Sequence, residues 1–345
     1  MATQVNPASI VLLAGGIGGA RFISGLRALI AERGWDTTIT VIVNNGDDIR
    51  LHGLQICPDL DSIMYTLGDG ISKDRGWGRE GETFVVRDEL AAYGVGPEWF
   101  GLGDKDLATH LVRTQMLAAG YSLADVTRAL CERWKPGVTL IPATNDRVET
   151  HVVVDADLPG TREAIHFQEW WIKHRAGIPA RDFVLVGAET ASPAPGVLEA
   201  IDGADVILFP PSNPIVSIGT ILQIPGIRQA IQTTRAPVVG LSPIIGAAPV
   251  RGMADACLAA IGVETSAAAV AAHYGARSSS ATSSSENGVI DGWLVDNLAD
   301  ADVVEQVSHL GITCRAVPLL MTDIPTTAAM AAAALDLASN IGTDA

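Results

Sequence analysis

The chain lacks several features that would identify its class directly. Only 5% of its 345 residues are aromatic, and no apolar run is long enough to cross a bilayer. Its first nine residues carry no basic patch ahead of an apolar segment, which argues against a secretory signal. The four cysteines lie far apart without a C-x-x-C pair, so we expect no disulfide framework and no structural zinc. These absences predict a cytoplasmic globular protein without membrane contact.

Basic residues are scarce as well. The chain has 23 Lys and Arg against 39 Asp and Glu, a formal net charge of −16. Such a field repels nucleic acid, so we expect no polynucleotide partner. An acidic protein can still bind a phosphorylated small molecule through backbone N–H groups and a divalent cation that carboxylates hold. The charge balance therefore favours small-molecule substrates.

A glycine-rich segment at residues 15–19 is the most informative feature present. It follows an apolar run at residues 10–13 and leads into a helical pattern, so its backbone N–H groups suit a phosphate. Arg21 stands where a dinucleotide fingerprint would have its third glycine, and no Gly-Lys-Ser/Thr ending follows. The predicted phosphate-binding residues are Gly15, Gly16, Gly18, Gly19 and Arg21.

Apolar, strand-like runs alternate with helical patterns along most of the chain. This alternation predicts an α/β fold with a Rossmann-like, mostly parallel sheet flanked by helices. The predicted strands are residues 10–13, 38–43, 139–141, 151–154, 183–186, 206–209, 238–241, 292–295 and 315–320. Helices are predicted at residues 19–32 and, closing the chain, at 326–338.

The alternation lapses after the second strand. Residues 61–67, 82–93, 105–119 and 123–134 all have helical patterns with no strand between them. We expect residues 61–135 to form a helical insertion that caps a cleft, within a single α/β domain of residues 1–345. The serine-rich segment at residues 277–288 is predicted to be a flexible surface loop.

Paired carboxylates follow the second predicted strand. Asp47 and Asp48 end the run Asn-Asn-Gly-Asp-Asp, and Asp61 follows at the start of a predicted helix. All three are expected near the glycine segment, where carboxylates and substrate phosphate oxygens suit Mg²⁺. For one residue alone a turn or a helix N-cap is the favoured interpretation. The cluster beside a glycine loop favours a metal site instead.

Other polar segments supply further candidates for substrate binding. Ser212, Asn213 and Ser217 follow a strand and precede a helical pattern, although a proline-rich turn is an equally good interpretation. Asp104 lies in a polar segment with His110, the best single candidate for a base, yet a lone histidine on a helix is more often structural. Trp170 and its neighbour Trp171 could stack on a flat ligand, although such pairs more often pack in a core.

Together these motifs resemble the 2-phospho-L-lactate transferase family of coenzyme F-420 biosynthesis. The resemblance covers nearly the whole chain and is closest to the actinobacterial members, which are described as phosphoenolpyruvate transferases. The matching segments are residues 15–22 (GGIGGARF), 45–48 (NGDD), 52–53 (HG), 57–61 (CPDLD), 64–68 (MYTLG), 101–104 (GLGD), 166–171 (HFQEWW), 211–214 (PSNP) and 251–255 (RGMAD).

The resemblance implies a transferase reaction. The ribityl hydroxyl of 7,8-didemethyl-8-hydroxy-5-deazariboflavin would attack the phosphorus that bears the enolpyruvyl or lactyl group in a guanosine diphosphate diester. GMP would leave, giving dehydro-F-420-0 or F-420-0. The resemblance also implies Mg²⁺ as cofactor, and a homodimer is the common expectation for a soluble enzyme. The residues leave open which three-carbon acid is carried.

This chemistry agrees with the residues, because phosphoryl transfer depends on alignment and charge stabilisation more than on a covalent enzyme group. We hypothesise that the glycines hold the donor phosphates and that Ser212 and Asn213 contact guanosine. Asp47, Asp48 and Asp61 would hold Mg²⁺ or position the hydroxyl, with Asp48 as general base. The alternatives are an NAD(P)-dependent oxidoreductase and a non-catalytic nucleotide-binding protein of the same fold.

Overall fold

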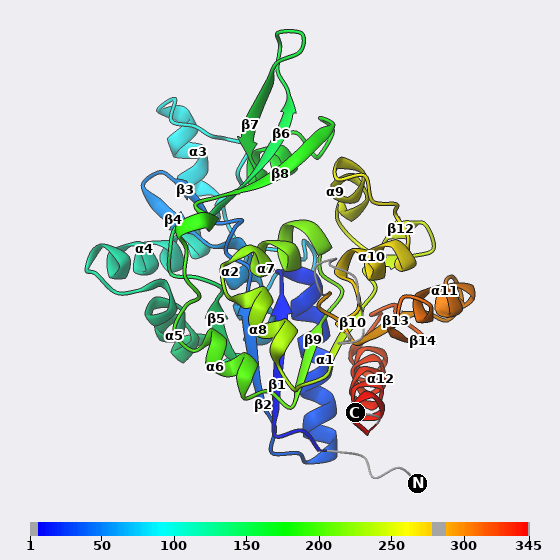
Figure 1. Ribbon diagram of the computed structural model, residues 1–345. Coiled ribbons are helices and arrows are strands. Elements are labelled where there is room, and N and C mark those ends of the chain that lie inside the picture. The colour runs from blue at the N-terminus through cyan, green and yellow to red at the C-terminus, as the bar shows by residue number, and fades with distance from the viewer. Residues whose placement is uncertain (1–5, 278–287, 344–345) are drawn as a thin grey trace.

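A seven-stranded parallel sheet organises the protein, here described from a computed structural model over residues 6–277 and 288–343. In chain order, its strands are β1 (Ser9–Ala14), β2 (Thr38–Val43), β5 (Thr139–Pro142), β9 (Val206–Phe209), β10 (Val238–Leu241), β13 (Gly292–Asp296) and β14 (Thr313–Val317). Across the sheet the order is β5-β2-β1-β9-β10-β13-β14 (Figure 1). The strands up to β5 are added on one side of β1 and those from β9 onwards on its other side, so the order of addition reverses between β1 and β9. This is the doubly wound Rossmann order, which confirms the predicted fold class.

Alternate residues of each central strand enter two separate cores. In β1, Ile10 and Leu12 pack in one hydrophobic cluster, while Val11 and Leu13 pack in the other. All four are fully buried because helices cover both faces of the sheet. A strand buried on both faces needs apolar residues at every position, which is why the run appears continuous in the sequence.

The helices divide between these two faces (Figure 1). One face carries α1 (Ile17–Arg33), α2 (Pro58–Leu67), α5 (Leu123–Trp134) and α12 (Ile324–Thr343). The other carries α6 (Val197–Asp202), α7 (Thr220–Gln223), α8 (Ile227–Thr233), α9 (Ala254–Ala260), α10 (Ala267–Tyr274) and α11 (Val304–Ser308). Short 3-10 or π turns occupy Glu169–Lys173, Ala188–Thr190, Pro214–Gly219 and Ala301–Val303. No helix of the described residues is both long and apolar enough to span a membrane.

Two of the predicted strands do not belong to the parallel sheet. Residues 151–154 and 183–186 lie in β6 (Glu149–Asp155) and β8 (Ala180–Val186). In a separate three-stranded sheet, β6 is the central strand and pairs antiparallel with β7 (Arg162–His166) on one side and with β8 on the other. In β6 only alternate residues are buried, because this smaller sheet packs on the body with one face. The mostly exposed β7 has no apolar signature, so the sequence did not predict it.

The segment between β2 and β5 holds a hairpin and four helices. The hairpin is β3 (Ile49–Leu51) with β4 (Leu54–Ile56), and the helices are α2, α3 (Val85–Ala92), α4 (Asp104–Ala118) and α5. Another short hairpin joins β11 (Ile244–Ile245) to β12 (Ala248–Pro249). Of the predicted flexible loop at 277–288, residues 278–287 lie outside the described part of the chain.

Helices α1 and α12 pack closely at Gly25, which generates a test of the core. A methyl group on Gly25 would come within 2.5 Å of the Thr327 Cγ2 atom and 2.7 Å of its carbonyl carbon. Gly25→Ala should therefore lower the free energy of unfolding by about 1–3 kcal/mol, although alanine normally stabilises a helix by roughly 0.5–1 kcal/mol. Urea denaturation measures this change.

The matched control for this test is Glu32→Ala, an exposed position on the same helix. Its effect should stay within about 0.5 kcal/mol. If Gly25→Ala were as stable as wild type, the two helices would not be in the close contact described here.

Candidate active site

A cavity of about 1020 Å³ opens at the carboxyl edge of the parallel sheet. Its walls include the loop after β1, with Gly15, Gly16 and Gly18, and the loop after β9, with Ser212 and Ser217. These two strands flank the point where the strand order reverses, the usual ligand position in doubly wound sheets.

The glycines let the first loop approach its neighbours closely. The Gly15 N–H donates to Ser212 Oγ at 3.3 Å. A Cβ on Gly16 would lie 2.6 Å from Asp59 Oδ1, and one on Gly18 would collide with the Pro211 carbonyl oxygen. The glycines thus serve the packing of three loops as well as any ligand.

Asn44, at the end of β2, ties these loops together. Its amide donates to Asp59 Oδ2 at 2.9 Å and to the Val216 carbonyl at 3.2 Å. Its Oδ1 accepts from the Gly46 N–H at 2.9 Å, which fixes the turn that presents Asp47. One amide therefore positions the loop after β2, the start of α2 and the loop after β9.

Asp47 and Asp59 form the part of the acidic cavity wall that lies beside the glycine loop. Burial raises the pKa of Asp47 well above its usual value, and Asp59 raises it further. Burial also raises the pKa of Asp59, to about 6, against the opposing effect of its hydrogen bonds with Asn44 and the Gly16 N–H. Asp47 Oδ1 has no hydrogen-bond partner among the described residues. A buried carboxylate oxygen without a donor is suited to bind a cation.

Asp48 lies behind this wall and does not line the cavity. Its Oδ2 accepts from the Cys57 thiol at 2.9 Å, and its backbone carbonyl lies 3.1 Å from His166 Nε2. Burial raises its pKa well above the usual value. Its Oδ1 has no hydrogen-bond partner among the residues described. Asp48 therefore has an unpaired carboxylate oxygen, as Asp47 does, but behind the cavity wall.

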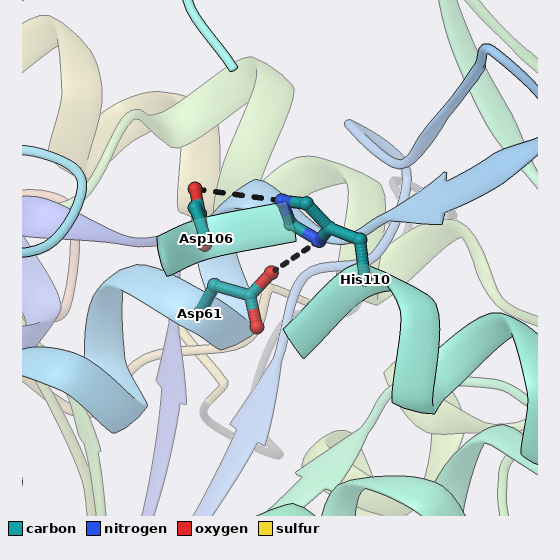
Figure 2. Close-up of side chains that lie close together, drawn as sticks. All are labelled: Asp61, Asp106 and His110. Atoms are coloured by element: carbon teal, nitrogen blue, oxygen red, sulfur yellow. Dashed lines mark ion pairs between the residues drawn. The ribbon is translucent and has the colours of Figure 1, made fainter. Parts of the chain in front are cut away.

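Asp61 belongs to a second cluster, with Asp106 and His110 (Figure 2). Their potential ligand atoms all lie within 4.8 Å of one another. The buried Arg113 forms a short ion pair with Asp61 Oδ1, so the Asp61 carboxylate already has a positively charged partner within the protein. Burial lowers the pKa of Arg113, but the charge and hydrogen bond of Asp61, together with the neighbouring Cys57 and Tyr65, raise it overall.

The hydrogen bonds of this cluster fix the orientation of His110. Arg113 Nη1 lies 3.1 Å from His110 Nδ1 and can only donate, so Nδ1 accepts and Nε2 carries the ring hydrogen. That Nε2 faces Asp106 Oδ2 at 3.4 Å, and Tyr65 donates to Asp106 Oδ1 at 2.6 Å. The cluster is thus a buried network that holds Asp61 and Asp106 at the cavity wall.

Aromatic side chains form another part of the wall. Few such residues exist in the chain, yet six line this cavity: Tyr65, Trp77, Trp99, Phe100, Phe167 and Trp171. Trp170, the sequence-based candidate, is fully buried, and its indole N–H donates to the Ile178 carbonyl at 2.7 Å. Its neighbour Trp171 is the one of the pair that reaches the cavity.

The structure brings most of the predicted site residues to one place. Those that line the cavity are Gly15, Gly16, Gly18, Arg21, Asp47, Asp61, Ser212, Asn213 and Ser217. Four do not line it: Gly19, Asp48, Trp170 and Asp104. Asp104 is half-buried and accepts from the Thr83 hydroxyl and from the Val85 and Val86 N–H groups, so it caps the start of α3.

Sequence analysis assigned no role to Asp59, Arg113 or Arg251. Asp59 lies in the CPDLD motif, two residues before Asp61, and could have been found there as a third carboxylate. Arg113 lies three positions after His110 on the same helix, a spacing at which side chains meet. Arg251, between β12 and α9, opens the RGMAD segment that carries part of the family resemblance, but only the fold shows that it lies at the cavity.

The sequence matches a known protein family and several curated proteins along most of the chain. The sequence profile of a family described as 2-phospho-L-lactate transferase CofD matches residues 10–317. A phosphoenolpyruvate transferase from Streptomyces coelicolor is 64% identical over 332 residues, covering 96% of this chain and 98% of the relative. One from Thermobifida fusca is 63% identical, covering 95% and 97%. One from Mycolicibacterium smegmatis is 54% identical, covering 95% and 98%.

A solved structure supports the fold. The crystal structure of a UPF0052 family protein from Bacillus halodurans superposes with a TM-score of 0.61 at 19% identity. The match covers 96% of this chain and 99% of the other. At that identity the likeness concerns the fold alone.

The raised pKa of Asp59 predicts a pH dependence of stability. Its carboxyl keeps a proton up to about pH 6 in the folded state, against 3.8 for the ordinary group. Between these values the folded state binds more protons than the unfolded chain, so this group's contribution to the free energy of unfolding falls as pH rises. Asp59→Asn should therefore reduce the fall in the free energy of unfolding between pH 4.5 and 7.5. Urea denaturation at these two pH values, without divalent cations, measures this fall.

The control for this experiment is Asp36→Asn, which removes an exposed carboxylate away from the cavity. It should keep the wild-type pH dependence. An Asp59→Asn profile parallel to that of wild type would show that Asp59 is not held protonated in this pH range.

Proposed function

Because the chain belongs to the CofD family of 2-phospho-L-lactate transferases, we propose that it transfers a phosphoenolpyruvyl or 2-phospholactyl group to a deazaflavin in coenzyme F-420 biosynthesis. The donor would be the guanosine diphosphate diester of the three-carbon acid, and GMP would leave. One observation carries the proposal: a single cavity combines a glycine loop, unpaired carboxylates and an aromatic wall. Its volume is at the upper end for small-molecule sites, which leaves room for two substrates.

In this proposal the donor's diphosphate lies against the loop after β1 and the start of α1. Helix α1 has no acidic residue in its first turn, so its N-terminus retains a positive potential toward an anion. Ser212 and Asn213, on the facing loop, are the proposed contacts to the guanosine part. Asn213 is held rigid because its Oδ1 caps the following turn, accepting from the Ile215 N–H at 2.9 Å.

The aromatic wall would receive the deazaflavin ring. Flat heterocycles stack on aromatic faces, and Trp77, Trp99 and Trp171 offer such faces beside the carboxylates. This arrangement would place the ribityl chain between ring and donor. Asp106, held by Tyr65 and His110, offers an acceptor to hydroxyls on that path.

We propose Mg²⁺ as cofactor, held by Asp47 with Asp59 beside it and Asp48 behind. The residues fit the ion, because Asp47 and Asp48 each have a buried oxygen without a hydrogen-bond donor among the described residues. When bound, the ion would neutralise charge on the diphosphate. Asp61 was also predicted as a ligand, but its pairing with Arg113 favours a positioning role.

The acceptor hydroxyl must lose its proton as the new phosphate ester forms. Asp47 and Asp59 are the carboxylates beside the glycine loop at the cavity surface, so we propose that one of them accepts this proton. Asp48, the base expected from the sequence, lies behind them. The bond between phosphorus and the GMP oxygen breaks in the same displacement, and no covalent enzyme intermediate is needed.

The reaction itself is tested by incubating the protein with Mg²⁺, the deazaflavin and each diester donor in turn. We expect release of GMP and a phosphodiester product by mass spectrometry, with the preferred donor identifying the three-carbon acid. Guanine-nucleotide binding without GMP release would indicate a non-catalytic binding protein. Binding of NADH, seen as a change in nicotinamide fluorescence, would indicate an oxidoreductase.

Asp47→Asn tests the carboxylate assignment. It should lower kcat/KM by roughly 100-fold or more and raise the Mg²⁺ concentration needed for half-maximal rate, because it removes a charged ligand. The rate is measured by GMP release across a Mg²⁺ titration. Asp36→Asn is the charge-matched control, and a variant at position 47 with the wild-type Mg²⁺ dependence would remove Asp47 from the metal site.

A further inference from the structure

Two arginines at the cavity have no negatively charged partner. Arg21 lies in the second turn of α1, just after the glycine loop, and Arg251 lies between β12 and α9. Both line the cavity, and neither forms an ion pair or hydrogen bond within residues 6–277 and 288–343. The third cavity-lining arginine, Arg87, already pairs with Asp88 at 2.7 Å.

The two unpaired arginines influence each other. Burial lowers the pKa of Arg251, and the charge of Arg21 lowers it further. The chain has a net charge of −16, yet neither of these two guanidinium groups forms an ion pair with a carboxylate of the described residues. Their repulsion is relieved when an anion binds between them.

Arg251 is also held against the protein. Its Nη2 atom lies 3.0 Å from where a Cβ on Gly76 would stand, so the guanidinium packs on the backbone of that loop. Gly76 has a φ of 70°, a conformation that favours glycine. The next residue, Trp77, lines the cavity, so Arg251 reaches from one wall toward another. An ordered guanidinium loses less freedom when it binds a ligand.

We propose that Arg21 and Arg251 form an anion clamp that holds a carboxylate or phosphate group of the donor. This inference rests on the proposed function and names residues that select its donor. The glycine loop and the proposed metal site already serve the diphosphate, so the clamp supplies the only unpaired positive side chains at the described cavity surface. Guanidinium groups bind carboxylate and phosphate oxygens in a bidentate manner, which gives geometric selectivity.

Calorimetric titration of the full chain in the presence of Mg²⁺ tests the clamp with two probes. GDP offers a diphosphate without the acid, and phosphoenolpyruvate offers the carboxylate. Arg21→Gln and Arg251→Gln should each weaken binding by roughly 10-fold, the effect of losing a charge-assisted contact. Phosphoenolpyruvate carries a phosphate as well as the carboxylate. Weaker binding of GDP therefore assigns the clamp to a phosphate, and weaker binding of phosphoenolpyruvate with unchanged binding of GDP assigns it to the carboxylate.

The charge-matched control is Arg128→Gln, an exposed arginine of α5 outside the cavity, which should bind both probes as wild type does. Thermal unfolding checks folding: removing either clamp arginine should leave the Tm unchanged or raise it, because repulsion is lost. Wild-type affinity in both clamp variants, or no binding of either probe to wild type, overturns the clamp. Failure of the proposed function is seen separately, as no GMP release from the diester donors.

Discussion

The site depends on one side-chain amide at the end of β2. Asn44 donates to Asp59 and to the carbonyl of Val216, while its oxygen accepts from Gly46. These bonds lock together three loops that come from different strands and that the glycines allow to approach closely. The reversal of strand order places β1 and β9 side by side, as in other doubly wound folds. The hydrogen bonds of Asn44 then fix where the carboxylates lie at this edge of the sheet.

That arrangement of carboxylates destabilises the folded state. Carboxylates at positions 47, 48 and 59 are removed from water close to one another, and burial is the largest reason for each raised pKa. Of the aspartates at positions 47, 48, 59 and 61, Asp61 is the one that forms an ion pair with an arginine among the described residues, with Arg113. Neutral residues at positions 47 and 48 would avoid this cost, and the proposed binding of a cation and an anionic substrate gives a reason for carboxyl groups there.

The sequence predicted what depends on local pattern. Continuous apolar runs identified the parallel strands, and glycines between a strand and a helix located the edge of the sheet where the cavity opens. Residues 151–154 were recognised as a strand but given the wrong sheet, because a short apolar run does not reveal its partners. Trp170 and Trp171 are adjacent in the sequence, and only the fold shows that Trp171 is the one that faces the cavity. Arg251 stands in a segment that carries the family resemblance, but no local pattern places its side chain at the cavity.

The charges of the cavity show how an acidic chain can bind a polyanion. Negative side chains gather beside the glycine loop, where a divalent cation would reverse their sign, and the unpaired guanidinium groups of Arg21 and Arg251 belong to other elements of the same cavity. The separation of these arginines from Asp47 matters, because an arginine paired with Asp47 would compete with the proposed cation. Asp61 is already paired in this way, with Arg113. In the proposed function, keeping backbone donors, carboxylates and guanidinium groups apart would let each act on a different part of one ligand, so that few basic residues would be needed.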